Sequence, residues 1–284
     1  MHKHTLIAIL TSFALLLAPA RADEPYGPPI ASVHELLMAL ETADRGLETL
    51  AADVQYDRRL ELQGDRHVRQ GRLFYISENN GGARPSRSFA IGFTNLFIGE
   101  RRQEDPQFWI FDGEWLVEKK ATEKQFIKRR VAPPDADFDP LRIGEGPMPI
   151  PIGQKAQDIL ARYDVERRTP DELFERDSPM AKFVKGSHHL RLVPKPHRAE
   201  QDEFVELRLW YRWEETHNRF LPRLARTKSH AGDESYVQLI NIKVNQNIDR
   251  RIFDVTPPQA AGWDIQVIDD LPDRAVVEAG DDRK

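Results

Sequence analysis

The side chains able to bind a metal or act as nucleophiles form no recognisable site in this sequence. The 284 residues contain no cysteine, which excludes disulfides, thiolate metal sites and cysteine nucleophiles. The stretch 34–38 begins like a zinc-protease box, but Met38 stands where the second histidine is needed. His188 and His189 are adjacent on an expected strand, so they point to opposite faces and cannot share one metal ion. We expect one of them to be exposed and the other to lie near the core.

Motifs for nucleotide binding and hydrolysis are also incomplete. Gly144-Glu145-Gly146 begins a dinucleotide fingerprint, but Pro149 occupies the place of the third glycine. No G-x-S-x-G serine-hydrolase motif occurs. Glu214-Glu215 lie in a polar turn, where solvated charge is the commoner explanation of a carboxylate pair. We therefore predict a protein that is not an enzyme and needs no cofactor or metal.

The charge balance restricts the possible partners. Lys and Arg total 41 against 46 Asp and Glu, a net charge of −5, which disfavours general nucleic-acid binding. A basic stretch, 118–130, could contact an anionic membrane or an acidic partner. The simpler interpretation, a solvated outer face of two strands, is favoured because charge runs usually only solvate a surface.

The first 22 residues resemble a secretory signal peptide. Lys3 precedes an apolar run, Leu6 to Ala18, and the small residues Ala20 and Ala22 suit cleavage before Asp23. A membrane anchor is disfavoured, since a span needs about 20 apolar residues. We expect export to the periplasm as a water-soluble protein, with one domain over 23–268 and a frayed acidic tail over 269–284.

Hydrophobic periodicity predicts a mainly β chain. A capped helix starts at Ser32, and the period changes to two from Leu50. Asp112-Gly113 predicts a hairpin turn. Six prolines between 131 and 151 predict a long loop, followed by a helix over 154–163 and another starting at Thr169. The strands are expected near 50–62, 69–77, 86–99, 107–112, 114–120, 124–132, 187–193, 203–213, 219–228, 235–245 and 262–268.

Short connections between these strands favour a meandering antiparallel sheet with helices packed on one face. Aromatic and branched side chains recur at alternating strand positions and form either ordinary core or the lining of a lipid cavity. These candidate lipid-binding residues are Phe74, Phe89, Ile91, Phe93, Phe97, Trp109, Phe111, Trp115, Leu207 and Leu209.

The order of several short motifs resembles the LolA-like family of outer-membrane lipoprotein carriers. The resemblance spans about 33–268, nearly the whole mature chain. The segments that carry it are Gly46-Leu47-Glu48-Thr49-Leu50, Gly71-Arg72-Leu73-Phe74-Tyr75, Arg84-Pro85, Asp112-Gly113-Glu114-Trp115-Leu116, Leu190-Arg191-Leu192-Val193-Pro194-Lys195, Asn245-Gln246-Asn247-Ile248 and Phe253-Asp254-Val255-Thr256-Pro257-Pro258.

The resemblance implies an unclosed antiparallel β-barrel with a helical lid over its apolar concave face. Such a protein binds the acyl chains of a lipoprotein, or a related lipid, and carries them through the periplasm to the outer membrane. It implies an inner-membrane release complex and an outer-membrane acceptor as partners, a monomeric state, and Arg84 as the latch of the lid. The alternative is a lipid-sensing regulatory module of the same architecture that binds a membrane signalling protein.

Overall fold

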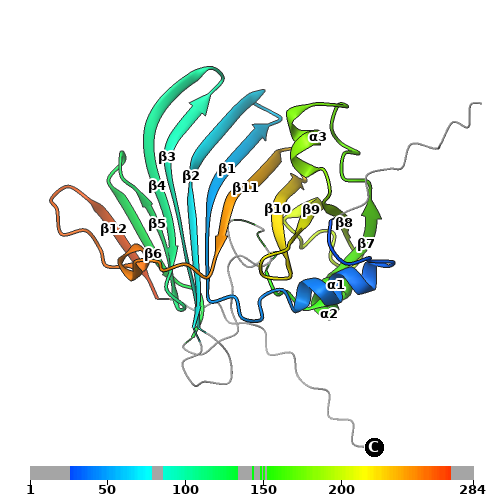
Figure 1. Cartoon of the computed structure of the whole chain (residues 1–284). Helices are drawn as coiled ribbons and strands as arrows, with labels where there is room; N and C mark the ends of the chain where they lie inside the picture. Colours follow the sequence, from blue (N-terminus) through cyan, green and yellow to red (C-terminus); the bar gives the residue numbers. More distant parts are fainter. Residues whose placement is uncertain are drawn as a thin grey trace, which may run out of the picture.

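The protein is built around one continuous β-sheet. Its computed structural model describes residues 26–78, 86–133, 143, 148, 150 and 152–269. Twelve strands form one sheet in the order β12-β6-β5-β4-β3-β2-β1-β11-β10-β9-β8-β7, and the two edge strands do not meet (Figure 1). The expected unclosed, mainly β architecture is confirmed. The expected signal peptide, Arg84 and residues 270–284 lie outside the described part of the chain.

The helices and strands have the following bounds. The strands are β1 Thr49–Leu60, β2 Asp65–Glu78, β3 Ser86–Ile98, β4 Arg101–Phe111, β5 Trp115–Lys120, β6 Gln125–Arg130, β7 Tyr163–Arg168, β8 His188–Pro194, β9 Phe204–Glu214, β10 Arg219–Ser229, β11 Glu234–Val244 and β12 Asp264–Ile268. The helices are α1 Val33–Glu41, α2 Ala156–Arg162, α3 Pro179–Val184 and the short 3-10 helix η1 Arg250–Phe253.

Two long crossings connect the halves of the sheet. The chain meanders from β1 to β6 toward one edge of the sheet and returns from the other edge through β7 to β11. Between β6 and α2, four side chains lie in the apolar cluster of the inner face, which we define as the face covered by α1 and α2; they are Ile143, Met148, Ile150 and Ile152. Residues 245–263 then pack on the outer face, and β12 joins the edge beside β6. β12 runs parallel to β6, so the expectation of a wholly antiparallel sheet is wrong for this pair.

Local chemistry explains where elements begin. The Ser32 hydroxyl accepts a hydrogen bond from the Glu35 amide at 3.1 Å, so α1 starts as the capping pattern predicts. In the turn before β5, the Asp112 carboxylate accepts from the amides of Glu114 and Trp115 at 3.0 and 2.8 Å. Gly113 has a φ of +109°, which only glycine adopts readily.

The segment between α2 and β8 departs from the sequence-based expectation. The helix expected at Thr169 is a run of turns, and the helix begins later, after the cap at Ser178. β7 was not expected, because its alternation is carried by Tyr163, Val165 and Arg167, of which only two are apolar. Within the described residues, no helix combines the length and apolar character needed to cross a membrane.

The outer face of β8 to β11 is covered by the chain that contains α3. Val184 and Trp210 are fully buried there, and the Trp210 indole donates to the Pro170 carbonyl at 2.8 Å. Beside them the Glu206 carboxylate accepts from Arg191, Arg208 and Arg226 at 2.6, 2.8 and 2.7 Å. Burial disfavours its charge, but Arg208 and Arg191 hold the pKa of Glu206 at about 2.

Both histidines of β8 are buried, so the expectation that one is exposed is wrong. His188 is 3% exposed on the inner face, and its ring meets the Phe220 ring edge-on. His189 is 1% exposed on the outer face, stacks on Trp210 with 4.1 Å between ring centroids, and hydrogen-bonds the Thr169 carbonyl. Burial lowers the pKa of each ring to about 4.

These shifts predict a loss of stability in mild acid. An unfolded histidine takes up a proton near pH 6.5 and the folded rings only near pH 4, so the unfolding free energy falls as pH drops through this window. Between pH 7 and pH 5 we expect a loss of roughly 2 kcal/mol per histidine, measured by urea unfolding.

The variant carrying His188→Gln and His189→Gln provides the control. It is expected to be less stable than the parent at pH 7 but to lose several kcal/mol less on acidification. Equal losses in parent and variant would show that other groups cause the pH dependence.

Candidate functional site

The inner face of the first half of the sheet is a continuous aromatic and aliphatic surface. Cross-strand pairing places Phe89 beside Phe111 and Ile91 beside Trp109. Phe89, Ile91, Phe93 and Phe111 are at most 1% exposed, and Trp109 is partly buried against them. The Phe93 and Trp109 rings meet edge-on with centroids 5.7 Å apart. Five of the predicted lining residues therefore share one surface.

The second half of the sheet continues this surface. Leu207 and Leu209 alternate along β9 and are 1% and 2% exposed. They pair with Leu192 and Leu190 of β8, and all four belong to the same apolar cluster as the aromatic residues of β3 and β4. The inner face thus offers one apolar wall from β4 to β8.

Three predicted lining residues lie on the outer face instead. Phe74 pairs with Ala90 and packs against Ile252 and Phe253 of the last crossing. Trp115 is one position out of phase with Leu116, which packs on the inner cluster, and the Lys128 ammonium lies 4.7 Å from the Trp115 ring centre. Both residues point to the outer face because successive side chains along a strand point to opposite faces of the sheet, and their immediate neighbours point inward.

A β-bulge explains the third misplaced residue, Phe97. The pairing between β2 and β3 shifts at Gly71, and the pairing between β3 and β4 shifts at the same level. A Cβ atom at Gly71 would lie 2.0 Å from the Gly92 carbonyl oxygen, so this close approach requires glycine. One extra residue reverses the alternation. Leu96, 5% exposed, thereby replaces Phe97 on the inner side.

The inner wall is covered by the chain itself. Leu36, Leu37 and Leu40 of α1 are 0%, 0% and 5% exposed, and Ile159 of α2 is 3% exposed. Four further side chains from the proline-containing connection are also buried in the same apolar cluster. They are Ile143, Met148, Ile150 and Ile152. We call α1, α2 and these four side chains the cover.

A small number of polar contacts join the pieces of the cover to the sheet and to one another. At the end of α1, the Asp44 carboxylate pairs with Arg87 of β3 at 2.7 Å, with the two side chains 22% and 11% exposed. The Glu41 carboxylate accepts from the Ala156 amide at 3.0 Å, which joins α1 to α2. The Arg162 guanidinium donates to the Ile143 carbonyl at 2.9 Å.

Arg87 was missed by the sequence analysis, which placed the latch at Arg84. The carboxylate that Arg87 contacts lies 43 positions away in the sequence, and no local pattern marks such a pair. The position of Arg84 is not described, so its expected role remains a prediction.

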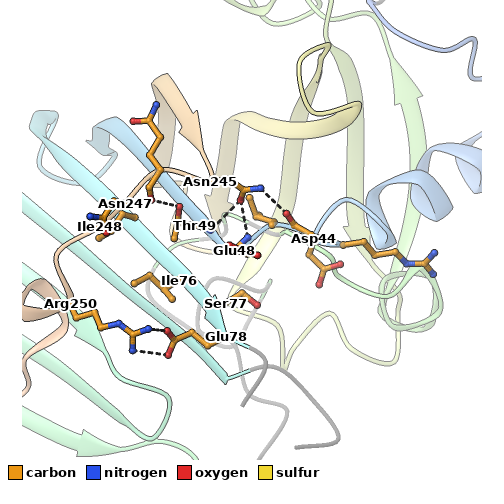
Figure 2. A pocket seen from close by; sticks show the side chains of 14 residues that line it. Asp44, Glu48, Thr49, Ile76, Ser77, Glu78, Asn245, Asn247, Ile248 and Arg250 are labelled. Atoms are coloured by element: carbon orange, nitrogen blue, oxygen red, sulfur yellow. Dashed lines mark hydrogen bonds and ion pairs between the residues drawn. The ribbon is translucent and has the colours of Figure 1, made fainter. Parts of the chain in front are cut away.

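A polar hollow lies where α1 passes into β1. It has a volume of about 900 Å³, and Figure 2 shows Asn245 between the ends of β11 and β1. The Asn245 side chain accepts from the Glu48 amide at 2.9 Å and donates to the Gly46 carbonyl at 2.9 Å. The motif around Asn245 thus joins the chain between the cover and β1 to the sheet. Charged residues such as the paired Arg250 and Glu78 make this hollow unsuited to hydrocarbon.

Comparisons with known proteins give similarity of fold only. No family model and no curated protein matches the sequence. An uncharacterised conserved protein from Thermus thermophilus is 14% identical, with a TM-score of 0.43, over 83% of this chain and 99% of that one. A LolA superfamily protein from Nitrosomonas europaea is 10% identical, with a TM-score of 0.32, over 79% and 98%. The Pseudomonas aeruginosa MucA/MucB complex matches at 13% identity and a TM-score of 0.36, over 79% of this chain and 61% of that one.

The Asp44–Arg87 ion pair is expected to stabilise the packing of α1 against the sheet. Arg87→Gln leaves the half-buried Asp44 carboxylate without its charged partner, which costs about 1–2 kcal/mol. We expect amide hydrogen exchange in α1 to become about five- to thirtyfold faster, measured by mass spectrometry.

Arg72→Gln is the matched control, because the Arg72–Asp53 pair is 3.7 Å long and about half exposed. It should leave exchange in α1 unchanged. Equal acceleration in both variants, or none in Arg87→Gln, would show that the pair does not hold the cover.

Proposed function

We propose that this protein is a periplasmic carrier that shelters the acyl chains of a lipoprotein, or of a related lipid, between the inner wall and the cover. The observation that carries the proposal is the combination of an almost entirely apolar wall with a cover made of short pieces held by few polar contacts. We expect such a cover to be displaced without unfolding the sheet, because every strand pairs with other strands and none pairs with the cover.

The free-energy requirement of such a carrier supports this reading. Keeping hydrocarbon out of water is worth about 0.8 kcal/mol per methylene, so one acyl chain needs on the order of 10 kcal/mol of apolar contact. Displaced cover side chains such as Leu36, Leu37 and Met148 would each lose roughly 1.5–3 kcal/mol of burial. Acyl chains that take their place restore apolar contact with the wall, so loading becomes an exchange of one apolar surface for another.

The same exchange allows cargo of different chain length. Hydrophobic contact is non-directional, so hydrocarbon needs no fixed geometry along the wall. The proposal assigns no catalytic group and no cofactor. Loading by an inner-membrane release complex and delivery to an outer-membrane acceptor complete the proposed route, with the protein travelling as a monomer.

The wall residues give a direct test with an internal control. Phe93→Asp places an unpaired charge in the apolar wall, whereas Phe97→Asp places one on the outer face of the same strand. We expect Phe93→Asp to weaken binding of a fluorescent acyl probe at least tenfold and Phe97→Asp to change it less than twofold. Ile91→Thr, which keeps the β-branched shape, is the milder second variant. Circular dichroism reports whether each variant is folded.

Native cargo is the decisive observation. Full-length protein purified from the envelope of its source should carry acylated molecules in native mass spectrometry. Protein that is always empty, and that also fails to bind the acyl probe, would overturn the proposal. Recovery of acyl cargo together with a membrane signalling protein, and with no transport partner, would favour the sensing alternative.

A further inference from the structure

A second, polar cavity opens on the inner face at the end of the sheet farthest from the junction of α1 and β1. It has a volume of about 490 Å³ and is lined by β1, β2, β4, β5, the turn after β5 and the residue before β9. Tyr56 and Trp109 line this cavity and also pack against the apolar cluster of the wall. The cavity, which we call the mouth pocket, therefore adjoins the space proposed for acyl chains.

Most charges of the mouth pocket already have partners. Arg69 pairs with Asp105 at 2.8 Å, and Lys120 lies 3.8 Å from Glu118 and 3.6 Å from Glu123. These groups are neutralised within the protein and add little affinity for an ion of either sign.

Two opposite charges of the mouth pocket are exposed to solvent and form no hydrogen bond or close ion pair with the described residues. Arg58 on β1 and Glu203 before β9 both line the mouth pocket, and neither has a hydrogen bond or ion pair there. Partial burial and the neighbouring Asp202 raise the pKa of Glu203, and the attraction of Arg58 opposes that shift. Because neither charge is held in a direct bond within the protein and both line one cavity, the pair is open to a ligand that carries one positive and one negative group.

We propose that the mouth pocket binds the zwitterionic head group of a phospholipid, with the phosphate at Arg58 and the ammonium at Glu203. The inference rests on the proposed function, because the acyl chains of that lipid would occupy the space beneath the cover. A guanidinium donates strong charge-assisted hydrogen bonds to phosphate. The rings of Tyr56 and Trp109 add attraction for the ammonium group.

The arrangement selects against an anionic head group. A phosphatidylglycerol phosphate would meet Arg58 but would leave Glu203 without a cation and beside added negative charge. With His67 taken as neutral, the mouth pocket has three cations, Arg58, Arg69 and Lys120, against four carboxylates, Asp105, Glu118, Glu123 and Glu203. Phosphatidylethanolamine meets both free charges and adds no net charge.

The test offers the full chain a choice of lipids. Protein is incubated with vesicles of equimolar dioleoyl phosphatidylethanolamine and dioleoyl phosphatidylglycerol, separated from them, and extracted for mass analysis of bound lipid. We expect phosphatidylethanolamine to be enriched at least fivefold. Glu203→Gln should bring the ratio close to one, and Arg58→Gln should reduce binding of both lipids severalfold. Glu215→Gln, an exposed carboxylate in the turn between β9 and β10, should change neither quantity.

The outcomes separate this inference from the proposed function. Lipid bound without a preference, or with a preference that Glu203→Gln does not alter, would overturn the head-group assignment and leave the carrier proposal intact. A diacylated lipopeptide without phosphate that displaces phosphatidylethanolamine when equimolar would also overturn it. Failure to bind any vesicle lipid, together with failure to bind the acyl probe, would instead remove the proposed function.

Discussion

An open β-sheet with one strongly apolar face must cover that face, and this constraint organises the whole molecule. A closed barrel would bury its interior by curvature alone, whereas here β12 and β7 stay apart. The chain therefore places α1, α2 and the side chains of Ile143, Met148, Ile150 and Ile152 on the inner side. These pieces pack by hydrophobic contact and are tied by few polar bonds, as the proposed exchange with acyl chains requires.

The two faces of the sheet are stabilised by different chemistry. On the outer side of β8 to β11, Glu206 joins three arginines under the chain that carries α3, so removing Glu206 would weaken the compensation of the buried charges of Arg208 and Arg226. On the inner side the wall is almost entirely apolar. The directional outer network suits a part that stays in place, and the non-directional inner contacts suit a part that moves.

Much of the fold could be read from local patterns. Ser32 and Glu35 predicted the start of α1, and Asp112-Gly113 predicted the hairpin turn between β4 and β5. The alternation of apolar and polar residues located most strands to within a few residues. The alternation of apolar residues was a weaker guide to which face of the sheet each side chain occupies. Phe74, Phe97 and Trp115 are aromatic like Phe89 and Phe93 but lie on the outer face. Phe74 and Trp115 stand at odd steps from the inward-facing residues of their strands, and a β-bulge shifts Phe97. A bulge adds a single residue, and composition does not reveal it.

The sequence by itself determined that the chain forms β-strands with an apolar face and carries helices to cover it, because these features follow from the spacing of side chains along the backbone. Only the tertiary structure decided which residues meet. Asp44 pairs with Arg87, and Ile143 packs in the inner apolar cluster. Arg58 and Glu203 line one cavity. In each case the order of the strands brings distant segments of the chain together. Strand order depends on the packing free energy of the whole sheet, which no local window of sequence contains.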